Sequence, residues 1–160
     1  MTATRGKTFY EVTLHEVGQD PQFGWIAPKH FENTETTGVG DDAASWGVDG
    51  VRKLKFHDSN ESIYRMKWRA GDTIGMAADL DRGTLTVGHN GKYRQLWKRI
   101  STPRGRGNSS STAKIDGGLA PGLSGSEGIV CTLNTGQKVW AVTGHGFKDA
   151  GQCGGIEGWA

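Results

Sequence analysis

Short stretches in which hydrophobic and polar residues alternate recur along the whole chain. In TFYEVTL (8–14), the series Tyr10, Val12 and Leu14 alternates with residues that would point to the opposite face. A period of two is typical of a β-strand in a sheet packed on one face. Similar stretches follow at residues 22–27, 44–48, 51–56, 72–79, 83–89, 92–97, 118–124, 128–134 and 138–142.

Turn-forming sequences separate these stretches. They are GQDP (18–21), VDG (48–50), DSNES (58–62), DLDRG (79–83), HNGK (89–92) and SGSEG (124–128). Asn90 and Gly91 suit the two positive-φ positions of a type I′ hairpin, which would join 83–89 to 92–97. Many short strands without a sustained helical period predict an all-β fold, an antiparallel β-sandwich of two sheets.

Length and composition agree with one domain. The chain has 160 residues, of which 26 are glycine, and 22% are charged. This length is enough to bury a hydrophobic core. We expect a sandwich domain over 1–148, with a basic polar insertion at 101–116, and a glycine-rich tail at 149–160. The predicted core residues are Tyr10, Trp25, Trp46, Ile74, Leu85, Val87, Ile129 and Leu133.

The sequence also bears on membrane insertion, secretion, nucleic-acid binding and disulfide formation. No apolar stretch approaches the roughly 20 residues that span a bilayer, and MTATRGK is not a signal peptide. The net charge of +2 is too small to indicate a nucleic-acid partner. Cys131 lies in an apolar stretch, which favours a buried thiol over a disulfide with Cys153. We therefore expect a soluble, intracellular (cytoplasmic), monomeric domain.

Two aspartate-rich segments raise the question of a metal site. In GVGDDAASWGVDG (38–50), Asp41 and Asp42 are adjacent, and DLDRG (79–83) resembles the start of a calcium loop. A calcium loop needs further oxygen ligands and a distant glutamate, but Arg82 takes a ligand position and no such glutamate follows. We expect both segments to bond backbone amides in turns, with no metal and no cofactor.

An ordered series of motifs resembles the SPRY (B30.2/SPRY) family. The motifs are GWIAPKHF, GVGDDAASWGVDGVRKLKFH, YRMKWRAGDTIGMAADLDRGTLTVGHNGKY, GLAPGLSG and LNTGQKV, and the resemblance extends over roughly Thr8 to Lys148. It implies a bent sandwich of two antiparallel sheets, with Trp46 in the core and the GDD loop as scaffold. It also implies a non-catalytic module that binds a peptide or folded protein as part of a larger protein or assembly.

The family's ligand contacts suggest candidate binding residues here. By alignment they fall in two loops, one before the GVGDD motif and one after residue 124. The candidates are Glu35, Thr36, Thr37, Gly38, Ser126, Glu127 and Gly128. The aromatic residues that peptide-binding members often carry in these loops are absent, which favours a more polar interface. The chain also has Arg65 where the family usually has glycine, and Thr135 where an aromatic residue is common.

Counting antiparallel strands assigns each loop to one end of the sandwich. The count places loops 27–44, 57–72, 89–92 and 124–128 at one end, and 15–21, 48–50, 80–83 and 101–116 at the other. Both candidate loops would then share an end, which we expect to bind a basic or polar peptide through Glu35 and Glu127.

Other functions find less support in the sequence. The five histidines show no metal-ligand spacing, no GxSxG motif is present, and no pair of carboxylates can be placed in one groove. We therefore expect no enzyme. RGRG (104–107) suggests nucleic-acid binding, but a solvated loop is the simpler interpretation. The alternative function is a lectin-like carbohydrate-binding domain, with Trp25, Trp97, Trp140 or Trp159 as an aromatic platform.

If the aspartates bond only the backbone, metals should not stabilise the protein. Adding calcium or zinc should leave the thermal midpoint unchanged, because only a ligand that binds the native state shifts it. Differential scanning fluorimetry with each metal, and with a chelator as control, measures this. A rise of several degrees with either metal would contradict the turn interpretation.

Overall fold

The computed structural model describes residues 2–98, 100, 115 and 117–136, which form ten β-strands. Nine strands coincide with predicted stretches; β5 was not predicted, and 138–142 lies outside the described residues. The strands are β1 (Lys7–Glu16), β2 (Gln22–Ile26), β3 (Ser45–Asp49), β4 (Leu54–His57), β5 (Asn60–Ile63), β6 (Thr73–Asp79), β7 (Thr84–His89), β8 (Lys92–Lys98), β9 (Ala120–Ser124) and β10 (Val130–Asn134).

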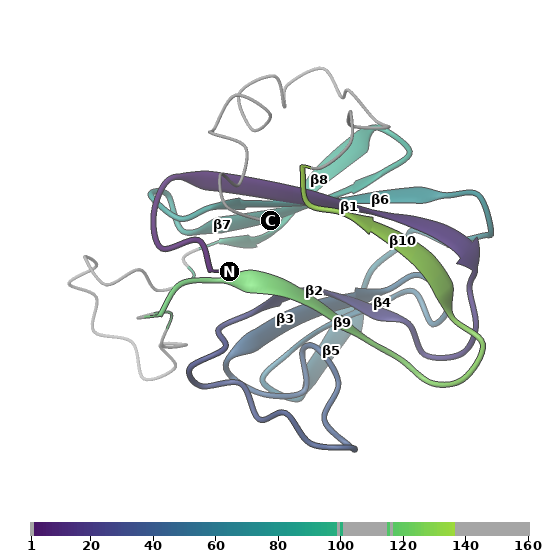
Figure 1. Cartoon of the computed structure of the whole chain (residues 1–160), viewed down its shortest axis with the longest axis horizontal. Coiled ribbons are helices and arrows are strands. Elements are labelled where there is room, and N and C mark those ends of the chain that lie inside the picture. Colours follow the sequence, from purple (N-terminus) through teal and green to yellow (C-terminus); the bar gives the residue numbers. More distant parts are fainter. Residues whose placement is uncertain (1, 99, 101–114, 116, 137–160) are drawn as a thin grey trace.

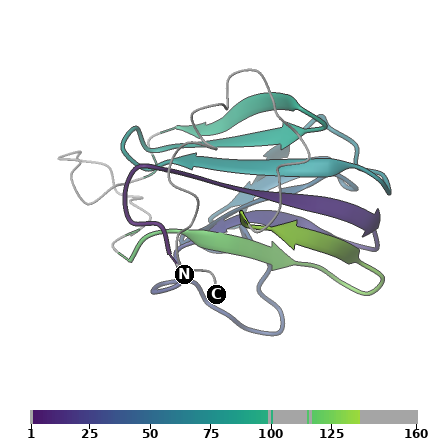
Figure 2. The same ribbon diagram turned by 45° about the horizontal axis from the view of Figure 1, so that its top comes forward.

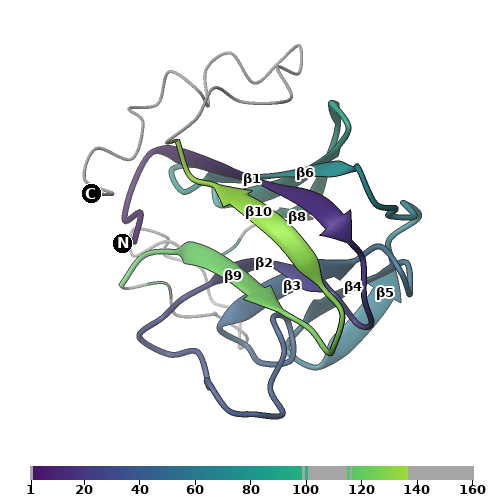
Figure 3. The ribbon, with the colours of Figure 1, turned by 45° about the vertical axis from the view of Figure 1, so that its right-hand side comes forward.

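The strands form two five-stranded sheets that pack face to face (Figure 1). One sheet has the order β10-β1-β6-β7-β8 and the other the order β5-β4-β3-β2-β9. Every neighbouring pair is antiparallel. Figure 2 shows the two layers from a tilted view, and Figure 3 shows β9 and β10 at the same open side of the sandwich. The predicted all-β antiparallel sandwich is confirmed. The described residues contain no helix that could cross a bilayer.

The core lies between the sheets and is built from aromatic side chains. Tyr10 of β1 packs edge-on against Trp25 of β2, with ring centroids 4.9 Å apart. The Tyr10 hydroxyl donates a hydrogen bond to the Gly24 carbonyl and so links the two sheets. Burial raises the pKa of this hydroxyl well above its usual range. The six predicted core residues that are buried are Tyr10, Trp25, Trp46, Ile74, Leu85 and Val87.

Two predicted core residues lie at the periphery. Leu133 is 42% exposed, and Ile129 is only half-buried. Leu133 pairs with the buried Val12, but its strand β10 forms the edge of its sheet in the described structure. One side of Leu133 therefore has no neighbouring strand to cover it. The prediction was wrong for Leu133 because an apolar alternating pattern does not reveal which strand is at the edge.

The first strand is buried on both faces, not on one. Phe9 and Glu11 alternate with the core series, yet they are only 6% and 1% exposed. Phe9 and Ala77 form a second small cluster, against which Tyr93 packs. The half-buried Cys131 pairs with Leu14, and burial raises the pKa of its thiol; Cys153 lies outside the described residues.

The two turns with the clearest sequence signals are confirmed. Asn90 and Gly91 have φ values of 48° and 81°, and they connect β7 to β8 as the predicted hairpin. In the turn between β6 and β7, the Asp79 carboxylate accepts a hydrogen bond of 2.9 Å from the Arg82 amide. Gly83 takes a φ of 64° there, so this segment is a turn that uses aspartate to bond the backbone.

Strand β5 lies where the polar sequence DSNES (58–62) predicts a turn. Asp58 and Ser59 have φ values of 54° and 57° and form a tight turn after β4. The next four residues, NESI, pair with β4, and all four are exposed. An edge strand without a buried face has no hydrophobic alternation, so the pattern could not reveal it.

The missed strand makes the strand-counting result wrong for the loops that follow it. Loops 64–72, 89–92 and 125–129 lie at the end that carries 17–21, and loop 80–83 lies at the opposite end. The contact between 17–21 and 125–129 is direct, because the Ser126 amide donates to the Gln19 carbonyl at 3.1 Å. One additional strand reverses the chain direction and moves every later loop to the other end. The insertion at 101–116 lies almost entirely outside the described residues.

Replacing Trp46 by alanine should destabilise the protein by about 3 to 5 kcal/mol, as large aromatic deletions in cores do. Trp46 is 1% exposed and stacks on His57, with ring centroids 4.9 Å apart. Urea unfolding measures the change. Ile63→Ala is the control, because Ile63 is 67% exposed and its loss should cost less than about 0.5 kcal/mol. Equal unfolding midpoints for Trp46→Ala and the parent would contradict the core assignment.

Candidate functional site

A row of glycines crosses the outer face of the second sheet. Gly24 of β2 pairs with Gly47 of β3 on one side and with Gly122 of β9 on the other. A Cβ on Gly47 would lie 1.8 Å from the Val39 carbonyl oxygen, which no real contact allows. A Cβ on Gly122 would lie 3.1 Å from a Val39 methyl group. The absence of side chains therefore lets the segment around Val39 lie directly on the sheet.

The two aspartates of the GDD motif hold this segment in place. Asp42 accepts hydrogen bonds from the Ala44 amide at 3.0 Å, the Ser45 hydroxyl at 2.5 Å and the Glu32 amide at 2.9 Å. Asp41 accepts one from the Gly38 amide at 2.7 Å. The predicted structural role of both residues is confirmed.

No group of three or more histidine, cysteine, aspartate or glutamate side chains suited to a metal ion occurs in the part of the chain that the structure describes. The carboxylate oxygens of Asp41 and Asp42 are instead directed at neighbouring amides and hydroxyls.

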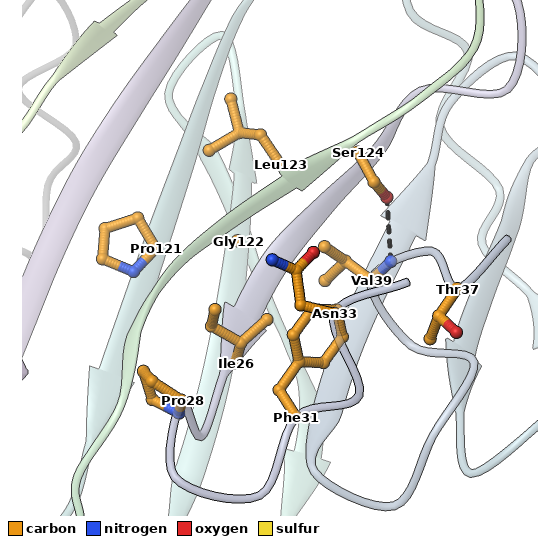
Figure 4. Close-up of a pocket in the computed structure, with 10 residues that line it drawn as sticks. All are labelled: Ile26, Pro28, Phe31, Asn33, Thr37, Val39, Pro121, Gly122, Leu123 and Ser124. Atoms are coloured by element: carbon orange, nitrogen blue, oxygen red, sulfur yellow. Dashed lines mark hydrogen bonds between the residues drawn. The ribbon is translucent and has the colours of Figure 1, made fainter. Parts of the chain in front are cut away.

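Loop 27–44 doubles back across the sheet and brings the two candidate loops together. Its path begins at the end of β2, but the Val39 amide donates a hydrogen bond of 2.8 Å to the Ser124 hydroxyl at the end of β9 (Figure 4). Residues 35–38 therefore lie beside Ser126, as predicted. The prediction came from counting strands, however, and that count places loop 124–128 at the wrong end of the sandwich. The contact depends on the fold of a long loop, not on the parity of the strands.

We name the resulting depression the polar pocket, with a volume of about 470 Å³. Five of the seven candidate residues line it: Glu35, Thr36, Thr37, Gly38 and Ser126. The other lining residues are Asp20, Gln22, Asn33, Thr34, Asp41, Arg52, Phe56, Ser124 and Gly125. Glu127 and Gly128 do not line the polar pocket. The Glu127 carbonyl accepts a hydrogen bond of 3.3 Å from the Gln19 amide, so this part of the loop contacts segment 17–21 instead. Whether any of the seven residues binds a ligand stays a prediction.

Sequence reasoning missed Arg52, the cation of the polar pocket. Its Nε atom lies 2.5 Å from an oxygen of the fully buried Asp49 and 3.3 Å from an oxygen of Asp20. Its guanidinium group lies over the Phe56 ring, 4.8 Å from the centroid. The short spacing between Asp49 and Arg52 could have suggested the first contact. No local signal joins residue 52 to residue 20, because the two loops meet only in the folded sandwich.

The polar pocket carries more carboxylates than cations. Asp20, Glu35 and Asp41 line it, against the single guanidinium of Arg52. That guanidinium already forms an ion pair with the buried Asp49. The local charge is therefore negative.

A second depression, which we name the apolar hollow, adjoins the polar pocket and measures about 310 Å³ (Figure 4). Six of its ten lining residues are hydrophobic, and the lining comes from the end of β2, loop 27–44 and β9. The two depressions share Asn33, Thr37 and Ser124. The remaining lining residues are Ile26, Pro28, Phe31, Val39, Pro121, Gly122 and Leu123.

The sandwich topology and the GDD loop define the class of protein. A family model for the SPRY domain matches residues 7–138, and the chain therefore belongs to the SPRY family. SPRY domains are typically protein-interaction modules and are generally non-catalytic. The two departures from the family pattern fit the fold, because Arg65 is exposed and Thr135 is a small residue that is buried.

Replacing Gly47 by alanine should destabilise the domain by about 1 to 3 kcal/mol, as overpacking does. The added methyl group would displace the Val39 carbonyl and lift the loop from the sheet. Chemical denaturation measures the loss. Gly117→Ala is the matched control, because its Cβ would meet only the Lys29 side chain at 3.2 Å. Equal stability of the Gly47 variant and the parent would contradict the close contact.

Proposed function

We propose that this SPRY domain binds a polar, lysine- or arginine-containing segment of a partner protein in the polar pocket. The observation that carries the proposal is the folded-back loop, which places residues 35–38 beside Ser126 at a surface with an excess of carboxylates. A cation from a partner would form charge-assisted hydrogen bonds with these carboxylates.

The existing contacts indicate which groups would meet a ligand. Asp49 and Asp20 hold Arg52, and Asp41 is bonded to Gly38, while Glu35 is exposed at the rim. An exposed ion pair contributes only about 0 to 1 kcal/mol, so Glu35 alone would not give a specific complex. Hydroxyl groups of Thr36, Thr37 and Ser126, together with loop backbone, would supply the additional polar contacts.

A rigid surface favours binding at this end. The polar pocket is built on β2, β4 and β9 and on a loop held by the GDD hydrogen bonds. A preorganised site avoids most of the entropy that a flexible segment would lose on binding, about 1 to 2 kcal/mol per fixed residue. For this reason we propose the polar pocket as the recognition surface, and not the insertion at 101–116, whose sequence is polar and low in complexity.

The carbohydrate alternative has less support in the described residues. A sugar site needs an exposed aromatic platform, but Trp25 is 2% exposed. Trp97 is half-buried, with the Lys55 ammonium group 5.4 Å from its ring centroid. Trp140 and Trp159 lie outside the described residues. The monomeric state and intracellular location stay predictions.

A random peptide library displayed on phage and selected on the full chain tests the proposal, with a glycan array as the comparison. We expect peptides rich in lysine or arginine, whose affinity falls as salt rises. Glu35→Lys should weaken binding about tenfold, because it replaces an attraction by a repulsion. Adding Glu127→Lys, which lies outside the polar pocket, should change affinity little further.

Two controls accompany these variants. Glu16→Lys makes the same charge change at an exposed position of β1, in the other sheet and outside the polar pocket, and should bind like the parent. Replacement of 103–113 by a glycine-serine linker should also preserve binding. If the linker variant loses binding while Glu35→Lys keeps it, the polar pocket is the wrong surface.

A further inference from the structure

We infer that the apolar hollow is a second subsite, which takes one large apolar side chain of the same partner segment that places a basic residue in the polar pocket. This inference rests on the proposed function and adds to it a specific ligand class. The occupant is an extended peptide segment of a partner protein, with an aliphatic or aromatic residue close to a lysine or arginine.

The walls of the apolar hollow come from three separate parts of the chain. Ile26 projects from the outer face of β2, Phe31 comes from loop 27–44, and β9 contributes residues 121–124 (Figure 4). The side chain of Leu123 packs against the core on the other face of the sheet, because Leu123 pairs with the buried Phe23. Gly122 has no side chain, and Val39 lies beside it at the floor. The glycine that allows the loop to approach the sheet therefore also leaves the hollow open.

Folding leaves this apolar surface in contact with water. Ile26 and Phe31 are only partly buried, and Pro28 is exposed. Covering such surface is favourable by roughly 25 cal/mol per Å². The volume of about 310 Å³ is at the lower end of the range for ligand pockets, which suits a single side chain better than a large cofactor.

The position of the apolar hollow indicates what would cover it. It shares Asn33, Thr37 and Ser124 with the polar pocket, so the two depressions form one continuous surface. No ionisable side chain lines the apolar hollow, whereas carboxylates line its neighbour. A segment that combines an apolar residue with a basic one is complementary to both.

The shape of the site favours a linear segment. Strand β9 forms the edge of its sheet in the described structure, and residues 121–124 of this strand line the apolar hollow. An extended chain can lie along such an edge and direct neighbouring side chains into the two depressions. In this type of binding only the extended segment of the partner has to contact the SPRY domain.

Peptides from the library selection provide the probe. We expect the selected peptides to carry one large apolar residue at a constant distance from a lysine or arginine. Three synthetic versions of the tightest peptide are then compared: the original, one with the apolar residue replaced by serine, and one with the basic residue replaced by serine. On the parent protein, loss of the apolar residue should weaken binding about tenfold.

Ile26→Asp places a charge inside the apolar hollow and should remove this tenfold difference between the original and the apolar-to-serine peptide. Ile63→Asp is the matched control, because Ile63 is exposed on β5 at the opposite edge of the same sheet, and it should preserve the difference. Thermal unfolding checks that both variants fold.

Amide NMR shifts on the parent give a readout without mutation: the amides of Phe31 and Leu123 should respond to the original peptide, and much less to the apolar-to-serine peptide.

The outcomes separate this inference from the proposed function. If affinity depends on the basic residue and on Glu35 but not on the apolar residue, the second subsite is wrong and the proposed function stands. The second subsite is also overturned if Ile26→Asp keeps the affinity difference between the original and the apolar-to-serine peptide, and the amide NMR signals of Phe31 and Leu123 do not shift. If no selected peptide requires Glu35, both proposals fail. Concentration-dependent dimers of the parent that Ile26→Asp abolishes would mean that a second copy covers the hollow, and would overturn the inference.

Discussion

The close contact between the segment around Val39 and the glycine row is the constraint on which the functional surface depends. Gly47 and Gly122 present bare backbone, so the Val39 segment can lie on the sheet without a layer of side chains between them. This approach directs loop 27–44 back toward the end of β9, where the Val39 amide bonds to Ser124. Without it, residues 35–38 and 126 would lie at opposite ends of the sandwich.

The aspartates and glycines of the GDD motif perform complementary tasks. The glycines permit the approach, while Asp41 and Asp42 satisfy the amides that the irregular loop leaves without strand partners. An unpaired buried amide costs about 1 to 3 kcal/mol, so these carboxylates contribute directly to the order of the loop. The GDD motif, which resembles a metal site in sequence, thus has a structural role. It holds loop 27–44 in the path that forms the polar pocket and the apolar hollow beside Ser124.

Core formation and surface formation follow different rules in this domain. The core between the sheets needs only apolar residues at alternate positions, and Tyr10, Trp25 and Trp46 meet that need in strands that are easily recognised. The surface needs loops from distant parts of the chain. Arg52 illustrates this, because it contacts the nearby Asp49 and the distant Asp20 at once. Its charge is therefore balanced before any ligand arrives, and the polar pocket remains acidic.

The alternating pattern and the turn residues determined most of the strands, the hairpin at Asn90 and the structural role of the GDD aspartates, since these depend on local periodicity and local hydrogen bonds. The ordered motifs added the family and the candidate loops. Only the tertiary structure decided that NESI is an edge strand, that Leu133 is exposed at a sheet edge, and that loops after β5 lie at the opposite ends from those counted. Edge position and loop path arise from contacts between residues far apart in the sequence. No periodicity records them, so the polar pocket and the apolar hollow became visible only in the folded chain.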